Sequence, residues 1–76
     1  MELTAQKDVF IRNLKLLKAH AGYSQTDLAN ATGLHLATIQ KIERGFNLPS
    51  DTSLKLIAKA FGYEPEALLK PLRVVE

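Results

Sequence analysis

The chain has 76 residues, of which 46% are hydrophobic and 24% are charged, and its formal net charge is +2. This length holds one domain, expected over residues 1–76 with a core at about 8–70, and this composition is that of a globular chain rather than a disordered one. With no cysteine and only two histidines, no disulfide, metal site or other cofactor is expected, and the small positive charge permits a polyanionic partner without requiring one.

The N-terminal residues Met1 to Thr4 do not resemble a signal peptide, because they lack its basic start and its apolar core. The apolar stretches along the chain are also far shorter than the ~20 residues that a membrane-spanning helix needs. We therefore expect a soluble, cytoplasmic protein with no membrane segment.

A first amphipathic helix is predicted from about residue 4 to residue 21. Phe10, Leu14 and Leu17 recur there at helical spacing, with basic residues between them. A glycine follows directly, which is typical of a helix end. His20 is interpreted as a solvated residue placed favourably against the helix dipole.

A second helix is predicted over residues 25–32. Ser24 before it is a favourable N-cap, because its hydroxyl can accept a hydrogen bond from a free backbone N–H of the first turn. Leu28 and Ala29 are expected to face the core, and Gly33 supplies the permissive backbone of a tight turn. This helix is therefore only about two turns long.

A third helix is predicted over residues 36–44, ending at Gly45. Ile39 and Ile42 stand three apart and bury one face of this helix, together with Leu34 from the preceding turn. The opposite face is left free to meet a partner. Its residues are Leu36, Ala37, Gln40, Lys41 and Arg44.

Two further helices are predicted beyond the connector at 46–49. Ser50 can cap a fourth helix with one apolar face, and a short fifth helix is predicted over 66–70, with Pro65 at its first turn and Pro71 at its end. Since no β-hairpin signal or internal repeat is present, we predict an all-α fold of five short helices around one core. The apolar face of the fourth helix is formed by Leu54, Ile57, Ala58 and Phe61.

The short helices at 25–32 and 36–44 have the features of a helix-turn-helix. Two helices that cross steeply need a small residue at their contact and a turn that accepts an unusual backbone conformation. Ala29 and Gly33 meet these two demands. The exposed face of the second helix of the pair can then enter the major groove of DNA.

Several sequence elements follow one another in order over more than twenty residues. They are SQ-x-x-LA from Ser24, then Gly33, then I-x-x-IERG from Ile39, and then Pro49 and Leu54. In these elements the chain resembles the phage-repressor (Cro and C1 type, Xre-like) helix-turn-helix family, over about residues 10 to 69. The resemblance implies a five-helix, lambda-repressor-like domain that binds double-stranded DNA, usually as a homodimer on a palindromic site, and that regulates transcription.

The resemblance also implies which residues contact DNA. Gln25 corresponds to a glutamine that reaches a backbone phosphate beside a helix N-terminus, where the helix dipole favours an anion. The start and outer face of the third helix correspond to positions that touch base edges, and its end to positions near phosphate. The predicted DNA-binding residues are Gln25, His35, Leu36, Ala37, Thr38, Gln40, Lys41, Arg44 and Asn47.

Some of these roles have alternatives. Lys41 can bind the acceptor atoms of guanine or only phosphate, and Gln40 can pair with adenine if its angle is suitable. His35 can contact DNA, cap the third helix or remain solvated.

The chain also departs from the family pattern at three positions. Leu36 and Ala37 are apolar where many relatives carry polar residues, so contacts with thymine methyl groups must contribute more of the base readout. Phe46 stands where relatives often have a lysine or arginine, which removes one expected phosphate contact.

Glu43 can be read as a functional acid on the recognition helix or as a structural residue. The resemblance favours the structural interpretation, in which Glu43 pairs with a basic residue of the first helix, here Lys18, and orients the two helices.

We interpret the chain as a transcriptional repressor that acts sterically on DNA. An enzyme is not expected, because no nucleophile, positioned base or pocket is evident. The alternative function is an antitoxin or protein-interaction module on the same fold, with a partner such as a toxin. The apolar residues Leu36 and Phe46 favour that alternative slightly.

The C-terminal tail, residues 71–76, is predicted to contribute to a homodimer. The C-terminal region carries more apolar residues than a short helix needs for packing on a small core, and an apolar patch is easily self-complementary. Alternatively, Leu68 and Leu69 complete the core and the valines remain solvated. The apolar residues concerned are Leu68, Leu69, Leu72, Val74 and Val75.

Overall fold

The structure is a computed structural model that describes residues 3–46 and 48–72. Over these residues the fold is all-α, as the sequence predicts, with four α-helices, one 3-10 helix and no strand. Within these ranges every helix is too short or too polar to span a bilayer. The elements are α1 (Leu3–Ala21), α2 (Gln25–Thr32), α3 (Leu36–Glu43), α4 (Asp51–Phe61) and η1 (Pro65–Leu69).

The fifth helix that the sequence predicts over 66–70 is present but shifted by one residue, and it is not an α-helix. The segment is a 3-10 helix over Pro65–Leu69, followed by Lys70 in extended conformation with φ −120° and ψ 152°. Because Pro71 disfavours the α region for the residue before it, the helix must end before Lys70. The third helix is also one residue shorter than predicted and ends at Glu43.

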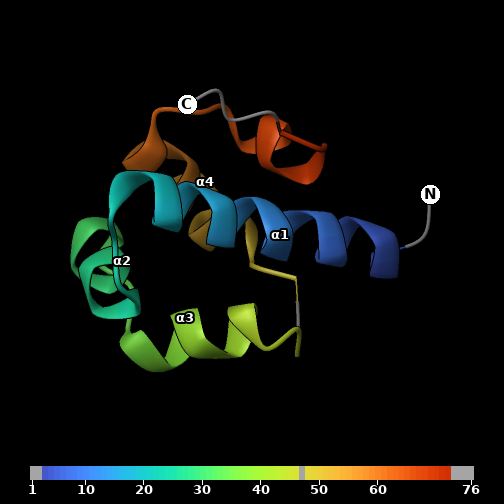
Figure 1. The fold of residues 1–76 in the computed structure, drawn as a ribbon. Coiled ribbons are helices and arrows are strands. Elements are labelled where there is room, and N and C mark those ends of the chain that lie inside the picture. Colours follow the sequence, from blue (N-terminus) through green and yellow to red (C-terminus); the bar gives the residue numbers. More distant parts are fainter. Residues whose placement is uncertain (1–2, 47, 73–76) are drawn as a thin grey trace.

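The helices pack around α1, which contacts α3 and η1. Figure 1 shows these two elements on opposite sides of α1. In addition, α2 contacts α3 and α4, and α4 contacts η1. The side chains between the elements form one buried apolar cluster, which explains why such short helices are stable together. Its residues are Phe10, Leu14, Leu17, Leu28, Ala29, Ile39, Ile42, Ile57, Ala58 and Leu68.

A buried asparagine on α1 binds the backbone of residues 68–72. The side chain of Asn13 is only 2% exposed. Its Nδ2 donates to the backbone oxygens of Leu68 and Lys70, at 2.8 and 2.7 Å, and its Oδ1 accepts from the backbone N of Leu72 at 3.3 Å. A buried amide side chain must find partners for its donors and its acceptor, and here three backbone groups supply them.

The same region bears on the prediction of a tail-mediated dimer. Leu68 is buried in the core, and Leu69 and Leu72 are partly buried and packed against it. These leucines therefore have a structural role within one chain. Val74 and Val75 lie outside the described residues.

Candidate nucleic-acid interface

The start of α2 is fixed by a reciprocal pair of hydrogen bonds. The Ser24 hydroxyl accepts from the backbone N of Asp27 at 3.0 Å, and the Asp27 carboxylate accepts from the backbone N of Ser24 at 2.9 Å. The capping box uses the backbone N–H of Asp27, and those of Gln25 and Thr26 make no hydrogen bond within the described residues. Gln25, the predicted phosphate-binding residue, is half-buried at this point.

Hydrogen bonds from Ser24, first from its backbone N–H and second from its side chain, hold the pKa of the exposed Asp27 carboxyl below its usual value. The carboxylate therefore stays ionised near neutral pH. Its charge is favourable for the helix N-terminus but opposes an incoming phosphate. An anion at this end is expected to approach the Gln25 side of the first turn.

The turn between α2 and α3 depends on a glycine and on a residue that the sequence did not single out. Gly33 has a φ of +77°, in the left-handed region that favours glycine, and its N–H donates to the Ala29 oxygen at 2.9 Å. The buried Thr32 hydroxyl donates to the Leu28 oxygen at 2.8 Å and accepts from the Leu34 backbone N at 3.2 Å. Thr32 thus connects the last turn of α2 to the chain that leads into α3.

His35 stands at the N-cap of α3, and its side chain makes no capping hydrogen bond. His35 is thus the N-cap residue of α3 through its backbone, and its imidazole takes no part in the cap. The His35 backbone oxygen accepts from Thr38 and Ile39 at 3.0 and 3.2 Å, so the helix begins without help from the imidazole. The exposed imidazole remains available to solvent or a ligand.

The two faces of α3 differ as the sequence predicts. Ile39 and Ile42 are buried, whereas His35, Leu36, Ala37, Lys41 and Arg44 are exposed and Thr38 and Gln40 are half-buried. No hydrogen bond within residues 3–46 and 48–72 involves the side chains of the polar members of this set. Their donors and acceptors are therefore not committed to holding the described fold. Asn47, the remaining predicted contact residue, lies outside the described residues.

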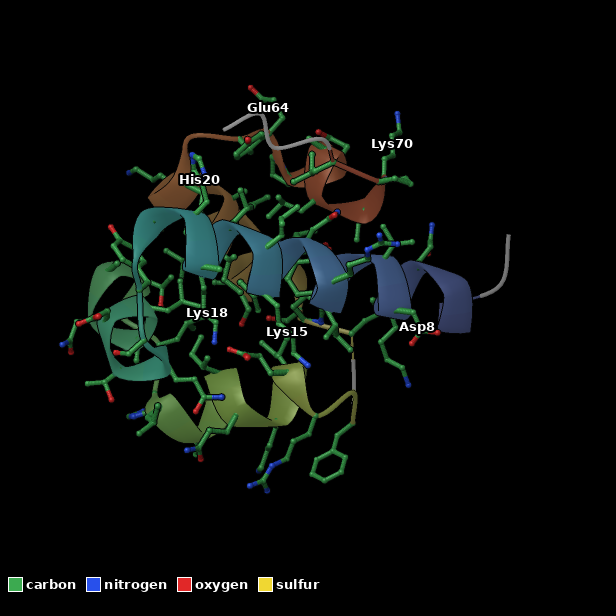
Figure 2. The ribbon with its side chains drawn as sticks, in the orientation of Figure 1. Asp8, Lys15, Lys18, His20, Glu64 and Lys70 are labelled. Carbon is green, nitrogen blue, oxygen red and sulfur yellow. The ribbon has the colours of Figure 1, made fainter. Side chains whose placement is uncertain are left out.

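Lys18 and Glu43 join α1 to α3. The Lys18 Nζ lies 2.8 Å from Oε1 and 2.6 Å from Oε2 of Glu43. The two side chains are only 13% and 8% exposed, and Figure 2 shows Lys18 extending from α1 toward α3. This pair joins α1 to α3 and neutralises the only carboxylate of α3. The positive charges of Lys41 and Arg44 therefore dominate the exposed face of the helix.

The end of α3 is closed by backbone bonds around Gly45. The N–H groups of Arg44, Gly45 and Phe46 donate to carbonyl oxygens of the last turn, and Gly45 has a φ of +81°. A Cβ on Gly45 would stand 3.4 Å from Cδ1 of Ile11, so this turn also packs against α1. Phe46 follows with 62% of its surface exposed.

A shallow hollow lies between α3 and the start of α4. It has a volume of about 230 Å³, and its lining includes Lys41, Thr38 and Ser50. An anionic group bound there would meet the Lys41 ammonium group and the N-terminal end of α4. Ser50 was recognised in the sequence only as a cap, and its hydroxyl does accept from the backbone N of Ser53 at 3.2 Å. No cluster of three or more metal-binding side chains occurs within the described ranges.

Comparisons with known proteins agree with this geometry. A model of the helix-turn-helix family matches residues 14–68. The chain is similar to the crystal structure of a hypothetical transcription factor, NHTF, from Neisseria, with a TM-score of 0.78 and 28% sequence identity over 92% of this chain and 77% of that chain. No curated protein matches the sequence. The chain therefore belongs to the Cro/C1-type helix-turn-helix family of DNA-binding regulators.

Proposed function

We propose that the chain is a sequence-specific transcriptional repressor that places α3 in the major groove of a palindromic operator and acts as a homodimer. The observation that carries this proposal is the uncommitted face of α3. Its exposed polar side chains make no hydrogen bond within the described residues, while its other face is anchored by Ile39, Ile42 and the Lys18–Glu43 pair. A rigidly held helix with free donors suits base readout.

Lys41 is the residue that we assign to direct base recognition. It is exposed on the outer face of α3, and a lysine in the major groove donates to the O6 and N7 acceptors of guanine. Leu36 and Ala37, at the start of the helix, are suited to thymine methyl groups. Thr38 and Gln40 are half-buried and contribute at the edges of this contact.

Gln25 and Arg44 are assigned to phosphate. Gln25 lies at the N-terminus of α2, where its side chain and two free backbone N–H groups favour an anion. Arg44, the exposed C-cap of α3, carries a charge that no acidic side chain of the described residues neutralises. His35, the N-cap residue of α3, and Asn47, which lies outside the described residues, complete the proposed contact set.

A dimer follows from the small size of this surface. A single recognition helix covers only a few base pairs, and two helices about 34 Å apart double the length of sequence that is read. The leucines of the C-terminal region pack against the core of one chain. The dimer contact is therefore sought among other exposed apolar residues and residues 73–76.

A footprint on the DNA upstream of the gene that encodes the chain tests this proposal. We expect protection of two half-sites about one helical turn apart, and an affinity that falls steeply with added salt because phosphate contacts release counterions. Equal affinity for a scrambled sequence would contradict specific recognition. A monomeric complex with one protected half-site would contradict the dimer.

A second candidate function is a protein-interaction module or antitoxin that uses the same surface. It is favoured by Phe46, which is 62% exposed, and by Leu36, which is 38% exposed on α3. An apolar protein interface should bind almost independently of salt, whereas a DNA complex should not. Salt-independent binding that requires Phe46 would favour this second function.

A further inference from the structure

The side of α1 that faces away from α3 carries a groove of about 540 Å³. Val9 and Leu16 of α1 form its apolar floor together with Leu72. Leu16 is 39% exposed and lies beside Val9 and Leu72 in the lining of the groove. The groove is therefore an apolar surface that the described residues of the chain leave open.

Hydrogen bonds hold the far wall of the groove in place. Pro71 forms this wall next to Leu72 of the floor, and the Asn13 side chain fixes the path of both residues by binding the backbone at Leu68, Lys70 and Leu72. Figure 2 shows Lys70 beside the end of η1. Since Asn13 is buried and all three of its hydrogen-bonding groups are used, the wall should keep its position when the groove is empty.

Two cations and no carboxylate line this groove. Both Arg12 and Lys15 are exposed, but Lys15 borders the groove from the side of α1 that Figure 2 shows toward α3, so Arg12 is the cation that faces the groove. The only ion pair within residues 3–46 and 48–72 joins Lys18 to Glu43, so neither cation has an acidic partner in the described structure. An occupant that complements the groove must combine an apolar group with negative charge.

DNA bound to α3 does not provide that occupant. Asn13 faces η1 and Lys18 faces α3, and five residues of α-helix separate their directions by about 140°. Figure 1 shows η1 and α3 on opposite sides of α1. A nucleic acid backbone is also a poor match for a floor of Val9, Leu16 and Leu72, because phosphate gains nothing from apolar contact.

We propose that this groove binds a segment of a partner protein in which an apolar side chain is flanked by acidic residues. The apolar side chain of the partner covers Val9, Leu16 and Leu72. A carboxylate of the partner pairs with the Arg12 guanidinium, which can bind it through two parallel hydrogen bonds in a bidentate geometry. Because the groove and the proposed DNA-binding face lie on different sides of α1, the chain can hold DNA and this partner together.

A random twelve-residue peptide library displayed on phage is the probe for this proposal. The library is selected on the full chain after depletion on the Leu16→Ser variant, which removes peptides that do not need the floor of the groove. We expect the recovered peptides to carry leucine or phenylalanine beside aspartate or glutamate. Recovery of basic peptides, or of none that depend on Leu16, would overturn the proposal.

A synthetic copy of a recovered peptide is then titrated into isotope-labelled chain. We expect chemical shift changes at Val9, Leu16 and Leu72, and an affinity about tenfold weaker for Arg12→Glu, because a like charge then faces the carboxylate. Lys59→Glu is the matched control, since Lys59 is an exposed cation on α4 outside the groove. Arg12→Gln provides a milder variant, and thermal unfolding verifies that each variant is folded.

Other occupants give different results, and each would overturn the proposal. Octanoate that binds at Val9 and Leu16 while acidic peptides do not would indicate a small amphiphilic anion. A loss of dimer mass in solution on Leu16→Ser would indicate a second copy of the chain. Peptide binding that appears only after deletion of residues 73–76 would indicate the chain's own tail. The DNA affinity of the Leu16→Ser variant, measured in parallel, should equal that of the wild-type chain. A loss of peptide binding in this variant is then distinct from a failure of the proposed DNA-binding function.

Discussion

The α2–α3 unit and the α1–η1 contact are held together in different ways. Within the α2–α3 unit the side-chain hydrogen bonds join residues that are close in the sequence, such as Ser24 and Asp27 or Thr32 and Leu28. The polar side chains on the exposed face of α3 make no hydrogen bond within the described residues. In the α1–η1 contact one side chain, Asn13, binds backbone groups that lie 55 to 59 residues away along the chain. Local bonds shape the proposed reading surface, which consists of Gln25 of α2 and the exposed face of α3. Long-range bonds close the fold behind it, from Asn13 to the segment around η1 and from Lys18 to Glu43.

The largest expected effect is a loss of stability on substitution of Asn13, which closes the α1–η1 contact. Asn13→Leu removes three hydrogen bonds and leaves the backbone groups of Leu68, Lys70 and Leu72 without their partner. We expect a loss of about 3 kcal/mol in the free energy of unfolding, measured with urea. Asn30→Ala is the matched control, since Asn30 is exposed on α2 and should change stability by no more than about 0.5 kcal/mol.

DNA affinity provides the other half of that test. While the Asn13→Leu variant is folded, its affinity for the operator should equal that of the wild-type chain, because Asn13 is on the η1 side of α1. A variant that unfolds cooperatively but binds DNA weakly would show that the two regions are coupled.

The same two regions show which features of the structure can be predicted from the sequence. The local signals at Ser24 and Gly33 predicted the bounds of α2 and the turn correctly, because each acts within four residues of its partner. The fifth helix ends one residue earlier than predicted because Pro71 disfavours the α region for Lys70. The predicted DNA-binding residues remain a prediction, since the exposed face of α3 is described without DNA.

Asn13 was missed although the sequence contains a signal for it. It stands in the apolar stripe of α1, three residues after Phe10 and four before Leu17, where a polar side chain must be buried. The pattern indicates burial but cannot name partners that lie 55 or more residues away in the sequence. The groove bounded by the segment that Asn13 fixes could not be predicted for the same reason.

The next largest effect is expected on the reading surface itself. Lys41→Ala should weaken specific DNA binding by about 2 kcal/mol and relax the base preference at one position of each half-site, because the lysine donates to a base edge. Fluorescence anisotropy on operator variants measures both effects. Lys59→Ala, which removes the same charge from α4, controls for the general loss of positive charge.

Two results at Lys41 would change the interpretation. Uniform weakening on all sequences would make Lys41 a phosphate contact. Unchanged binding would remove it from the interface. Gln25→Ala should, by contrast, weaken binding to every sequence alike, since a phosphate contact reads no base.

The Lys18–Glu43 pair connects the two regions, because it joins α1 to α3. Both side chains are mostly buried, and the pair is bonded through both carboxylate oxygens. A double-mutant cycle with Lys18→Met and Glu43→Gln should give a coupling energy of about 1.5 kcal/mol, between the values for exposed and fully buried pairs. Additivity within about 0.3 kcal/mol would mean that the pair does not orient α3.

The smallest expected effect is a pH dependence at the capping box. The folded-state pKa of Asp27 is lowered because the Ser24 backbone N–H and side chain bond to its carboxylate. The carboxylate therefore stabilises the fold above its unfolded pKa, near 4, and this contribution is lost as the pH falls through the lower folded pKa. Asp27→Asn has no such titration. The stability difference between wild type and Asp27→Asn should be constant from pH 7 to about pH 5 and should shrink below about pH 4.

A difference that stays constant down to the lowest pH at which the chain is folded would show that the Ser24–Asp27 bonds do not stabilise α2 through the ionised carboxylate. The start of the proposed reading surface would then depend on the Ser24 hydroxyl alone.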